Sequence, residues 1–369
     1  MQQNRYLALD VLRGMTVTLM IIVNTPGNGA TTFAPLHHAH WHGFTPTDWV
    51  FPTFMFVVGN AMSFSLVKYE SLGNPAVLKK IFKRTLLIFL LGYLLYWFPF
   101  VQENDAHEWV MAPAGNTRIM GVLQRIALGY CFGSLIIHYW KERGAIIFSF
   151  VALLGYWLLM VAFGDLTMEG NAASKLDTLI LGDNHLYHDE GMAFEPEGIL
   201  STLPSIVNVI LGYFAGRLIQ QKGNTYETIA KLMIAGALLA FTGLCWDLVF
   251  PINKKLWTSS FVLYTVGLDL LILGILLYVI EILNYRRWTY FFEVFGKNTL
   301  FIYLVSELGV ILLFAFQMGG KSWYRGIYQS IFEPLAGSYV GSLLFAMSWM
   351  LFCWLVGYVM DKRKIYIKV

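Results

Sequence analysis

Residues 10–59 have the sequence DVLRGMTVTLMIIVNTPGNGATTFAPLHHAHWHGFTPTDWVFPTFMFVVG. An apolar run of helix length ends at Pro26 and Gly27, a polar loop rich in His follows, and a second apolar run begins after Pro46. Proline and glycine interrupt helices, so they mark the end of the first element. The stretch therefore predicts two membrane-spanning helices joined by a polar loop.

The rest of the chain repeats this pattern. Of its 369 residues, 57% are apolar and 13% are charged, whereas soluble domains have roughly 45–50% and about 25%. Apolar runs long enough to cross a bilayer recur at about residues 7–25, 46–67, 81–101, 119–139, 145–163, 199–219, 229–250, 260–282, 298–317 and 338–360. We therefore expect an all-α, polytopic integral membrane bundle of about ten transmembrane helices, forming a single domain over residues 1–369.

The positions of Lys and Arg predict the orientation of this bundle, because cytoplasmic loops carry an excess of these residues. With the N-terminus in the cytoplasm, eighteen of the 26 Lys and Arg residues fall in cytoplasmic segments and six in the opposite loops. Both termini are thus predicted to be cytoplasmic. The small net charge of +3, without a basic stripe, argues against a nucleic-acid partner.

The cysteines all fall inside apolar stretches, at Cys131, Cys245 and Cys353. Their odd number and their positions argue against a disulfide framework or a cysteine metal site. Asp10 and Arg13 interrupt the first apolar run, and no small-residue cleavage site follows it. We therefore expect a retained first helix rather than a signal peptide.

The first predicted helix carries polar residues at two depths. Asp10 and Arg13 lie one turn apart on one face and can neutralise each other in the bilayer. Two interpretations stay open: an ion pair that fixes helix packing, or contact with an anionic ligand from the cytoplasm. Asn24 follows Arg13 by eleven residues, which places it about 16 Å nearer to the outer surface.

The outer loops concentrate the groups that can do chemistry. Residues 164–198 hold eight acidic residues and one Lys, and the loop after the first helix holds His37, His38, His40 and His42 around Trp41. Imidazole can take a proton or carry an acyl group near neutral pH, and a carboxylate such as Asp48 can fix its tautomer. A solvated His cluster and a metal site are the alternatives that spacing alone leaves open.

Six blocks of sequence carry a resemblance to a known family. They are R-x-L-x-L-D-V-x-R-G at residues 5–14 followed by V-N at 23–24, H-x-x-W-x-G-x-T-x-x-D-x-V-F-P at 38–52, GVLQRI at 121–126, PEGIL at 196–200, and NKKLWTSS at 253–260 with GKN at 296–298. Together they resemble the heparan-α-glucosaminide N-acetyltransferase family, including its bacterial relatives. The blocks extend from the first predicted span to the ninth, so the resemblance covers nearly the whole chain.

The resemblance implies a single transmembrane acyltransferase domain that uses cytosolic acetyl-CoA to acetylate the amino group of a glucosamine on the far side of the membrane. On the family's pattern, the active-site His falls on His38 and the Asn of the first span falls on Asn24. The resemblance also implies a lipid-embedded enzyme for which a homodimer is reasonable. The short N-terminal region favours a bacterial inner membrane.

Imidazole chemistry is consistent with this implied activity. His38 either deprotonates the acceptor amine or is acetylated first and passes the acetyl group on, and the sequence does not choose. Asn24 can donate to the thioester oxygen, a contribution of about 3 kcal/mol for one such donor, or cap its helix. Asp48 either orients His38 or fixes the start of the second helix.

Further residues are candidates for holding the two substrates. For the phosphates of acetyl-CoA they are Arg13, Arg125, Lys254, Lys297 and Asn298. Lys254 can instead meet an acidic sugar or close an outer gate.

For the amino-sugar acceptor, the candidates are Trp41 and Trp257, whose rings can stack on a sugar, and Glu197, which can instead cap a helix. We expect acetyl-CoA as co-substrate and no metal. The alternative function is a sugar transporter or permease, in which intramembrane charges form a gate and the His cluster senses protons.

Overall fold

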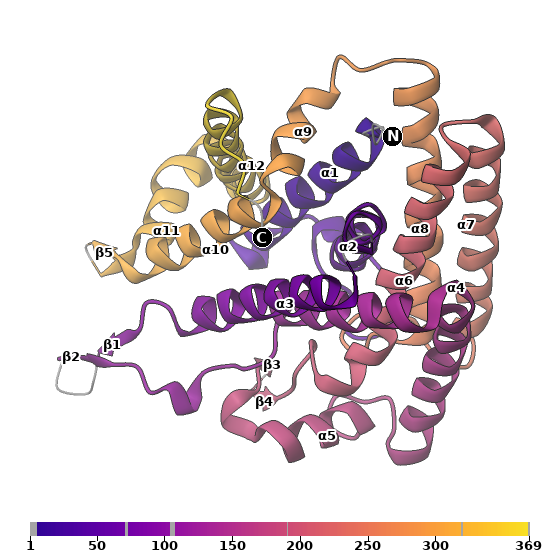
Figure 1. Cartoon of the computed structure of the whole chain (residues 1–369). Coiled ribbons are helices and arrows are strands. Elements are labelled where there is room, and N and C mark those ends of the chain that lie inside the picture. Colours follow the sequence, from indigo (N-terminus) through magenta and orange to yellow (C-terminus); the bar gives the residue numbers. More distant parts are fainter. Residues whose placement is uncertain (1–5, 71–72, 104–107, 190, 319, 368–369) are drawn as a thin grey trace.

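The computed structural model describes residues 6–70, 73–103, 108–189, 191–318 and 320–367. The helices are α1 (Leu7–Asn24), α2 (Pro46–Glu70), α3 (Asn74–Trp97), α4 (Val122–Phe163), α5 (Ala172–Leu181), α6 (Ile199–Lys222), α7 (Tyr226–Asp247), α8 (Ser259–Leu276), α9 (Thr289–Lys297), α10 (Thr299–Ala315), α11 (Trp323–Ile327) and α12 (Glu333–Lys362). Short antiparallel pairs are formed by β1 (Val101–Glu103) with β2 (Trp109–Met111), β3 (His188–Asp189) with β4 (Met192–Ala193), and β5 (Gln317–Met318) with β6 (Lys321–Ser322). Figure 1 shows a helical bundle in which β1 and β2 project from one side and β3 and β4 lie between α3 and α5 in the view.

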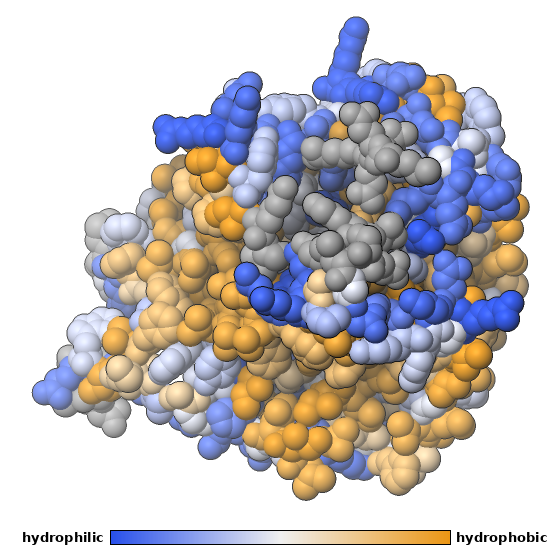
Figure 2. All heavy atoms as spheres, in the orientation of Figure 1, coloured by the Kyte–Doolittle hydropathy of each residue, from blue (hydrophilic) through white to orange (hydrophobic). Residues whose placement is uncertain are grey.

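The prediction of an all-α polytopic membrane protein is confirmed. Among the described residues, seven helical stretches are long and apolar enough to cross a membrane, and α9 with α10, bent by 83°, brings the number up to eight. Each of the ten predicted ranges overlaps a helix. The count of ten crossings stays a prediction, as does the cytoplasmic location of the termini. Apolar side chains cover a large part of the surface in Figure 2, as contact with lipid requires.

One long element, α4, accounts for two of the predicted spans. The predicted ranges 119–139 and 145–163 both fall on it, and its backbone leaves the helical conformation at Lys141, where φ is 57°. The helix therefore consists of two halves joined by a sharp break. Lys141 and Arg143 beside this break are the cations that the sequence assigns to the loop between the two spans.

The helices divide into an inner and an outer group. The apolar windows of α2 and α6 are 78% and 72% buried, whereas those of α4 and α7 are 28% buried and present most of their surface outward. Helices α2 and α6 can approach closely because glycines face backbone at their crossing. A Cβ on Gly59 would lie 1.9 Å from the carbonyl oxygen of Val209, and one on Gly212 would lie 2.0 Å from that of Phe56.

The two ends of the bundle have separate sets of loops. At one end, Arg13 of α1 and Ile367 of the C-terminal segment line the same cavity. At the other end, the His-rich loop after α1, the segment before α6 and the loop between α7 and α8 meet around a second cavity. Helix α1 reaches both cavities.

Candidate active site

Asp48, in the first turn of α2, fixes the His-rich loop to the start of that helix. Its Oδ2 accepts hydrogen bonds from the backbone N–H groups of Ala39 (3.0 Å) and Thr45 (3.0 Å) and from the Thr45 hydroxyl (3.1 Å). The carboxylate is 1% exposed, so these donors replace its water. Because Oδ1 takes no part in these bonds, the same side chain can both cap α2 and orient His38.

The other carboxylate oxygen of Asp48, Oδ1, forms a hydrogen bond with His38. Its Nδ1 lies 2.7 Å from Asp48 Oδ1, the pairing that the sequence suggested. An ionised carboxylate only accepts hydrogen bonds, so Nδ1 carries the proton and the lone pair of a neutral ring is on Nε2. With 46% of the side chain exposed, the imidazole remains accessible from the cavity.

Lys254, from the loop between α7 and α8, is the second charged neighbour of His38. Its Nζ lies 3.1 Å from Nε2 and 3.2 Å from Nδ1 of the imidazole. Burial lowers the pKa of His38, the hydrogen bond to Asp48 opposes this effect, and the charge of Lys254 lowers the pKa further. The net direction is downward, which favours an unprotonated imidazole near neutral pH.

These residues open on a cavity of about 640 Å³, which we call the His38 cavity. Its volume lies within the range of about 300–1,000 Å³ that is typical of small-molecule sites. It is lined by Asn24, His37, His38, Ala39, His40, Trp41, Asp48, Arg118, Val122, Tyr187, Pro196, Glu197, Lys254 and Lys255. No group of three or more His, Cys, Asp or Glu side chains in the described ranges is arranged to hold a metal ion.

Trp41 and Glu197, two of the residues that the sequence offered for binding an acceptor, both line this cavity. The indole of Trp41 is fixed by a 2.7 Å hydrogen bond from Nε1 to the carbonyl oxygen of Leu166 and by edge contact with the ring of Phe194. Lys255 Nζ lies 5.8 Å from the centre of the Trp41 ring. The cavity thus presents an aromatic ring, a carboxylate and cations to the same space.

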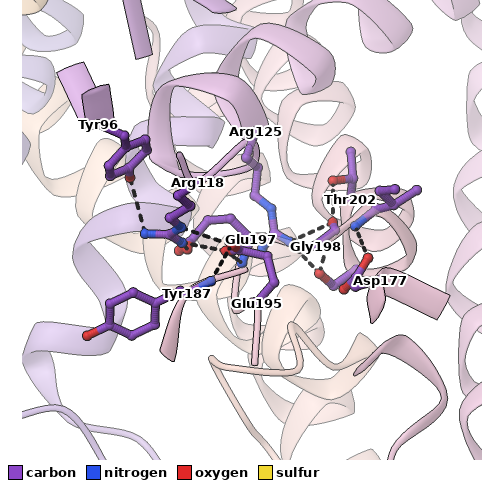
Figure 3. Close-up of polar contacts among 11 residues, drawn as sticks. Tyr96, Arg118, Arg125, Asp177, Tyr187, Glu195, Glu197, Gly198 and Thr202 are labelled. Carbon is purple, nitrogen blue, oxygen red and sulfur yellow. Dashed lines mark hydrogen bonds and ion pairs between the residues drawn. The ribbon is translucent and has the colours of Figure 1, made fainter. Parts of the chain in front are cut away.

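Glu197 belongs to an ionic cluster around Arg118 (Figure 3). The Arg118 guanidinium binds the carboxylates of both Glu195 and Glu197 and lies 4.9 Å from the ring centres of Tyr96 and Tyr187. Burial would raise the pKa of Glu197, but the charge of Arg118 and other nearby cations hold it below the usual value. Glu197 therefore stays ionised at the edge of the cavity.

Arg125 and Trp257 lie behind this cluster, and neither is among the residues that line the His38 cavity. Arg125 is fully buried, donates to the Gly198 carbonyl oxygen (3.2 Å) and to the Ser201 hydroxyl, and lies 4.8 Å from the centre of the Trp257 ring. Trp257 is 1% exposed and donates to Asn208 Oδ1 at 3.0 Å. Arg125 thus supports the start of α6, and Trp257 is anchored to Asn208, farther along the same helix.

At the opposite end of the bundle, the Arg13 cavity has a volume of about 310 Å³. The cavity is lined by apolar residues of α2, α3, α4 and α10 and by four cations, Arg13, Lys80, Arg84 and Lys297. Arg13 also donates to Asp10 (3.4 Å) and to the Gly296 carbonyl oxygen (3.3 Å). Arg13 thus forms the ion pair that the sequence offered as one interpretation and also lines a cavity, while its contact with an anionic ligand stays a prediction.

Lys297 and Asn298 link this cavity to the end of the chain. Lys297 Nζ pairs with Asp361 Oδ1 at 3.0 Å. The Asn298 amide donates to the Ile365 carbonyl oxygen (3.0 Å) and accepts from the Ile367 N–H (2.9 Å). Asn298 therefore fastens the C-terminal segment that forms one wall of the cavity.

Asn24 lies at the other end of α1 and borders two cavities. It lines the His38 cavity and a neighbouring one of about 500 Å³ that is lined also by Tyr324, Arg325 and Tyr328. Its Nδ2 donates to Glu307 Oε1 at 3.4 Å. An amide nitrogen carries two hydrogens, so the second remains for a ligand.

Sequence reasoning did not single out three charged residues that line the two cavities, Lys80, Arg84 and Arg118, or Glu195, which pairs with Arg118. The sequence analysis used Lys80 and Arg84 only as positive charges that predict the orientation in the membrane. It used Arg118 and Glu195 only as charged residues of the outer loops. The eight acidic residues of 164–198 were a signal that charge gathers there. The sequence could not pair them with Arg118, which precedes Glu195 by 77 positions.

Comparison with known proteins shows the family of this chain. The family model described as "Heparan-alpha-glucosaminide N-acetyltransferase, catalytic" matches residues 5–250. The heparan-alpha-glucosaminide N-acetyltransferases of Mus musculus and Homo sapiens are 28% and 27% identical to the chain, each over 99% of its length. The chain spans 61% and 60% of the length of these two relatives. Because the model match covers more than half of its residues, the chain belongs to the heparan-alpha-glucosaminide N-acetyltransferase family.

Proposed function

We propose that this protein is a transmembrane N-acetyltransferase that moves acetyl from cytosolic acetyl-CoA to the amino group of a glucosamine-type sugar on the outer side of a bacterial inner membrane. The observation that carries the proposal is the His38–Asp48 pair, with a 2.7 Å contact, facing a cavity of about 640 Å³. The names of the mouse and human relatives support both the acetyl transfer and the amino-sugar acceptor.

Neutral His38 can begin the transfer in two ways. In the first, Nε2 takes a proton from the acceptor amine as the amine nitrogen attacks the thioester carbonyl carbon. In the second, Nε2 attacks that carbon itself and the acetyl group then passes to the amine. In both, an amide bond forms, the carbon–sulfur bond breaks, and the CoA thiolate leaves with the electron pair and takes up the proton.

Three further residues can bind the reacting groups beside the imidazole: Asn24, Glu197 and Trp41. The free N–H of Asn24 can donate to the thioester oxygen as negative charge develops there. The ionised carboxylate of Glu197 attracts the ammonium form of an amino sugar and accepts from its hydroxyl groups. The Trp41 ring offers a flat apolar surface for the sugar. Each of the three lines the His38 cavity.

The Arg13 cavity supports a donor with several phosphates. Arg13, Lys80, Arg84 and Lys297 bring four positive charges to a space of about 310 Å³. Phosphates bind best where cations and N–H donors converge. We assign the nucleotide end of acetyl-CoA to this cavity and its thioester end to the His38 cavity, with the pantetheine arm along α1.

A transfer assay in sealed vesicles of known orientation tests this function. Radiolabelled acetyl-CoA is supplied on the side of the Arg13 cavity and a panel of amino sugars on the other. We expect labelled N-acetyl sugar on the acceptor side and unlabelled CoA on the donor side. Uptake of unmodified sugar without acetylation would support the transporter alternative and contradict the proposal.

A further inference from the structure

Lys254 is held beside His38 by a rigid turn between α7 and α8. In this turn, Asn253 Oδ1 accepts from the Leu256 N–H at 2.8 Å, and the Asn253 N–H donates to the Thr258 hydroxyl at 3.1 Å. Trp257 adopts a positive φ of 53°, and its buried side chain holds the backbone of the turn in place. The backbone on both sides of Lys254 is therefore fixed, and its ammonium group is directed at the imidazole.

Several charged groups from different elements surround His38. Asp48 comes from α2, Glu197 from the segment before α6, and Lys254 from the loop after α7, and all three influence the charge of the ring. Burial lowers the pKa of Lys254, and Asp48 and Glu197 oppose this effect. The other charged or titratable groups that line the cavity are His37, His40, Arg118, Tyr187 and Lys255.

The position of Lys254 disfavours a positive charge on the His38 ring. Its Nζ lies 3.1 Å from Nε2 and 3.2 Å from Nδ1, so the ammonium group is close to both ring nitrogens and does not lie on the axis of either lone pair. A second positive charge on the ring would be repelled at this distance. Asp48 accepts the proton of Nδ1 at 2.7 Å and leaves the lone pair of the neutral ring on Nε2.

We propose that Lys254 keeps His38 unprotonated between turnovers and, once a substrate displaces it from the imidazole, provides positive charge to the oxygen of the reacting acetyl carbonyl. This inference rests on the proposed function. As the new bond to the carbonyl carbon forms, the π electrons of the C=O bond move to its oxygen, and Lys254 donates a hydrogen bond to that oxygen without losing a proton. The pair returns to the carbon when the thiolate leaves.

This role differs from the phosphate-binding role that the sequence suggested for Lys254. The side chain lies in the His38 cavity, whereas the cations suited to phosphates line the Arg13 cavity. A lysine that bound phosphate would mainly affect donor affinity. A lysine at the reacting carbonyl would mainly affect the rate of the bound complex.

Two substitutions separate these roles. Lys254→Met removes the charge and keeps the length of the side chain, and Lys254→Arg keeps the charge. We expect Lys254→Met to lower kcat by about 10²- to 10³-fold, as for the loss of one oxyanion donor, with an unchanged KM for acetyl-CoA. Its pH–rate profile should lose activity at a higher pH than the wild type, because His38 is more easily protonated without the neighbouring cation. Lys254→Arg should restore the wild-type position of this acidic limb.

Lys175→Met is the matched control, because Lys175 is an exposed lysine on α5 outside both cavities. It should leave kcat, KM and the pH profile unchanged. Direct binding of acetyl-CoA to Lys254→Met tests whether that variant is folded. A raised KM with an unchanged kcat, or an acidic limb at the wild-type pH, would overturn the proposal.

A substrate-free measurement separates this inference from the proposed function. The imidazole of His38 can be followed by NMR of protein labelled with ¹⁵N-histidine, with His38→Gln used for assignment. We expect its titration to move to higher pH in Lys254→Met and not in Lys175→Met. If the wild type transfers no acetyl group, the proposed function fails. If the titration does not move, the contact with Lys254 does not control His38.

Discussion

Arg13 and Asn24 lie on the same helix, eleven positions apart, and line different cavities. At 1.5 Å per residue the distance between them along α1 is about 16 Å. A donor with phosphates beside Arg13 and a thioester beside Asn24 must therefore extend along α1. This relationship connects the basic cavity at one end of the bundle with His38 at the other.

His38→Ala should abolish acetyl transfer. Loss of a general base costs about 10²- to 10⁴-fold in rate, and loss of a nucleophile would leave no covalent route. Binding of acetyl-CoA should be nearly unchanged, because the cations that we propose for its phosphates lie in the other cavity. Single-turnover transfer and equilibrium binding on the same preparation measure the two effects.

The neighbouring histidines serve as internal controls for His38. The ring of His37 bonds to the Thr32 carbonyl oxygen at 3.1 Å, and that of His42 lies 3.4 Å from the Asn253 amide. Substitution of His37, His40 or His42 by Ala should cost much less activity. Comparable losses at several of these positions, with inhibition by chelators, would indicate a metal site instead.

Arg13→Ala and Arg125→Ala should have different effects. Arg13 lines the basic cavity, so its loss should raise the Kd and KM for acetyl-CoA about tenfold or more, since one charge-assisted hydrogen bond contributes about 1.5–3 kcal/mol. Arg125 is buried against Trp257 and the start of α6, so its loss should lower thermal stability. Equal donor affinity in a folded Arg13→Ala protein would assign Arg13 to its ion pair with Asp10 alone.

Asp177→Asn should increase stability above neutral pH. Burial raises the pKa of Asp177 from 3.8 to about 7, so between these values the folded protein binds more protons than the unfolded chain, and stability falls as pH rises through this window. Asn keeps the oxygen that accepts from the Ile199 N–H at 2.7 Å and removes the charge. The gain above pH 7 should be at most about 4 kcal/mol, from about 1.36 kcal/mol per pKa unit.

Thermal unfolding in detergent between pH 4 and pH 8 measures this effect. The Asp177→Asn protein should unfold at a higher temperature than the wild type at pH 8 and at nearly the same temperature at pH 4. Asp183→Asn, which removes an exposed carboxylate nearby in sequence, should show no such pH-dependent difference. A constant difference across the whole pH range would contradict the titration of Asp177.

The predicted orientation places position 183 outside and position 284 in the cytoplasm. Both residues, Asp183 and Asn284, are exposed. In a background without the three native cysteines, an impermeant thiol reagent should label Asp183→Cys in intact cells and label Asn284→Cys only after permeabilisation. The reverse pattern would mean that the His38 cavity faces the cytoplasm.

The sequence by itself determined the fold class and several members of the site. Runs of apolar residues had to become helices, because backbone polar groups cannot remain unpaired in lipid. Each of the ten predicted ranges overlaps a helix. His38 and Asp48 were also accessible to sequence reasoning, because they lie only ten positions apart on either side of a helix start.

Only the tertiary structure decided how distant residues combine. Lys254 follows His38 by 216 positions, yet its ammonium group lies 3.1 Å from the imidazole. Arg125 and Trp257 had the residue types of a binding site, but their side chains turn toward each other inside the bundle. Local spacing sets which face of a helix a residue occupies, whereas the packing of helices from remote parts of the chain sets what that face meets.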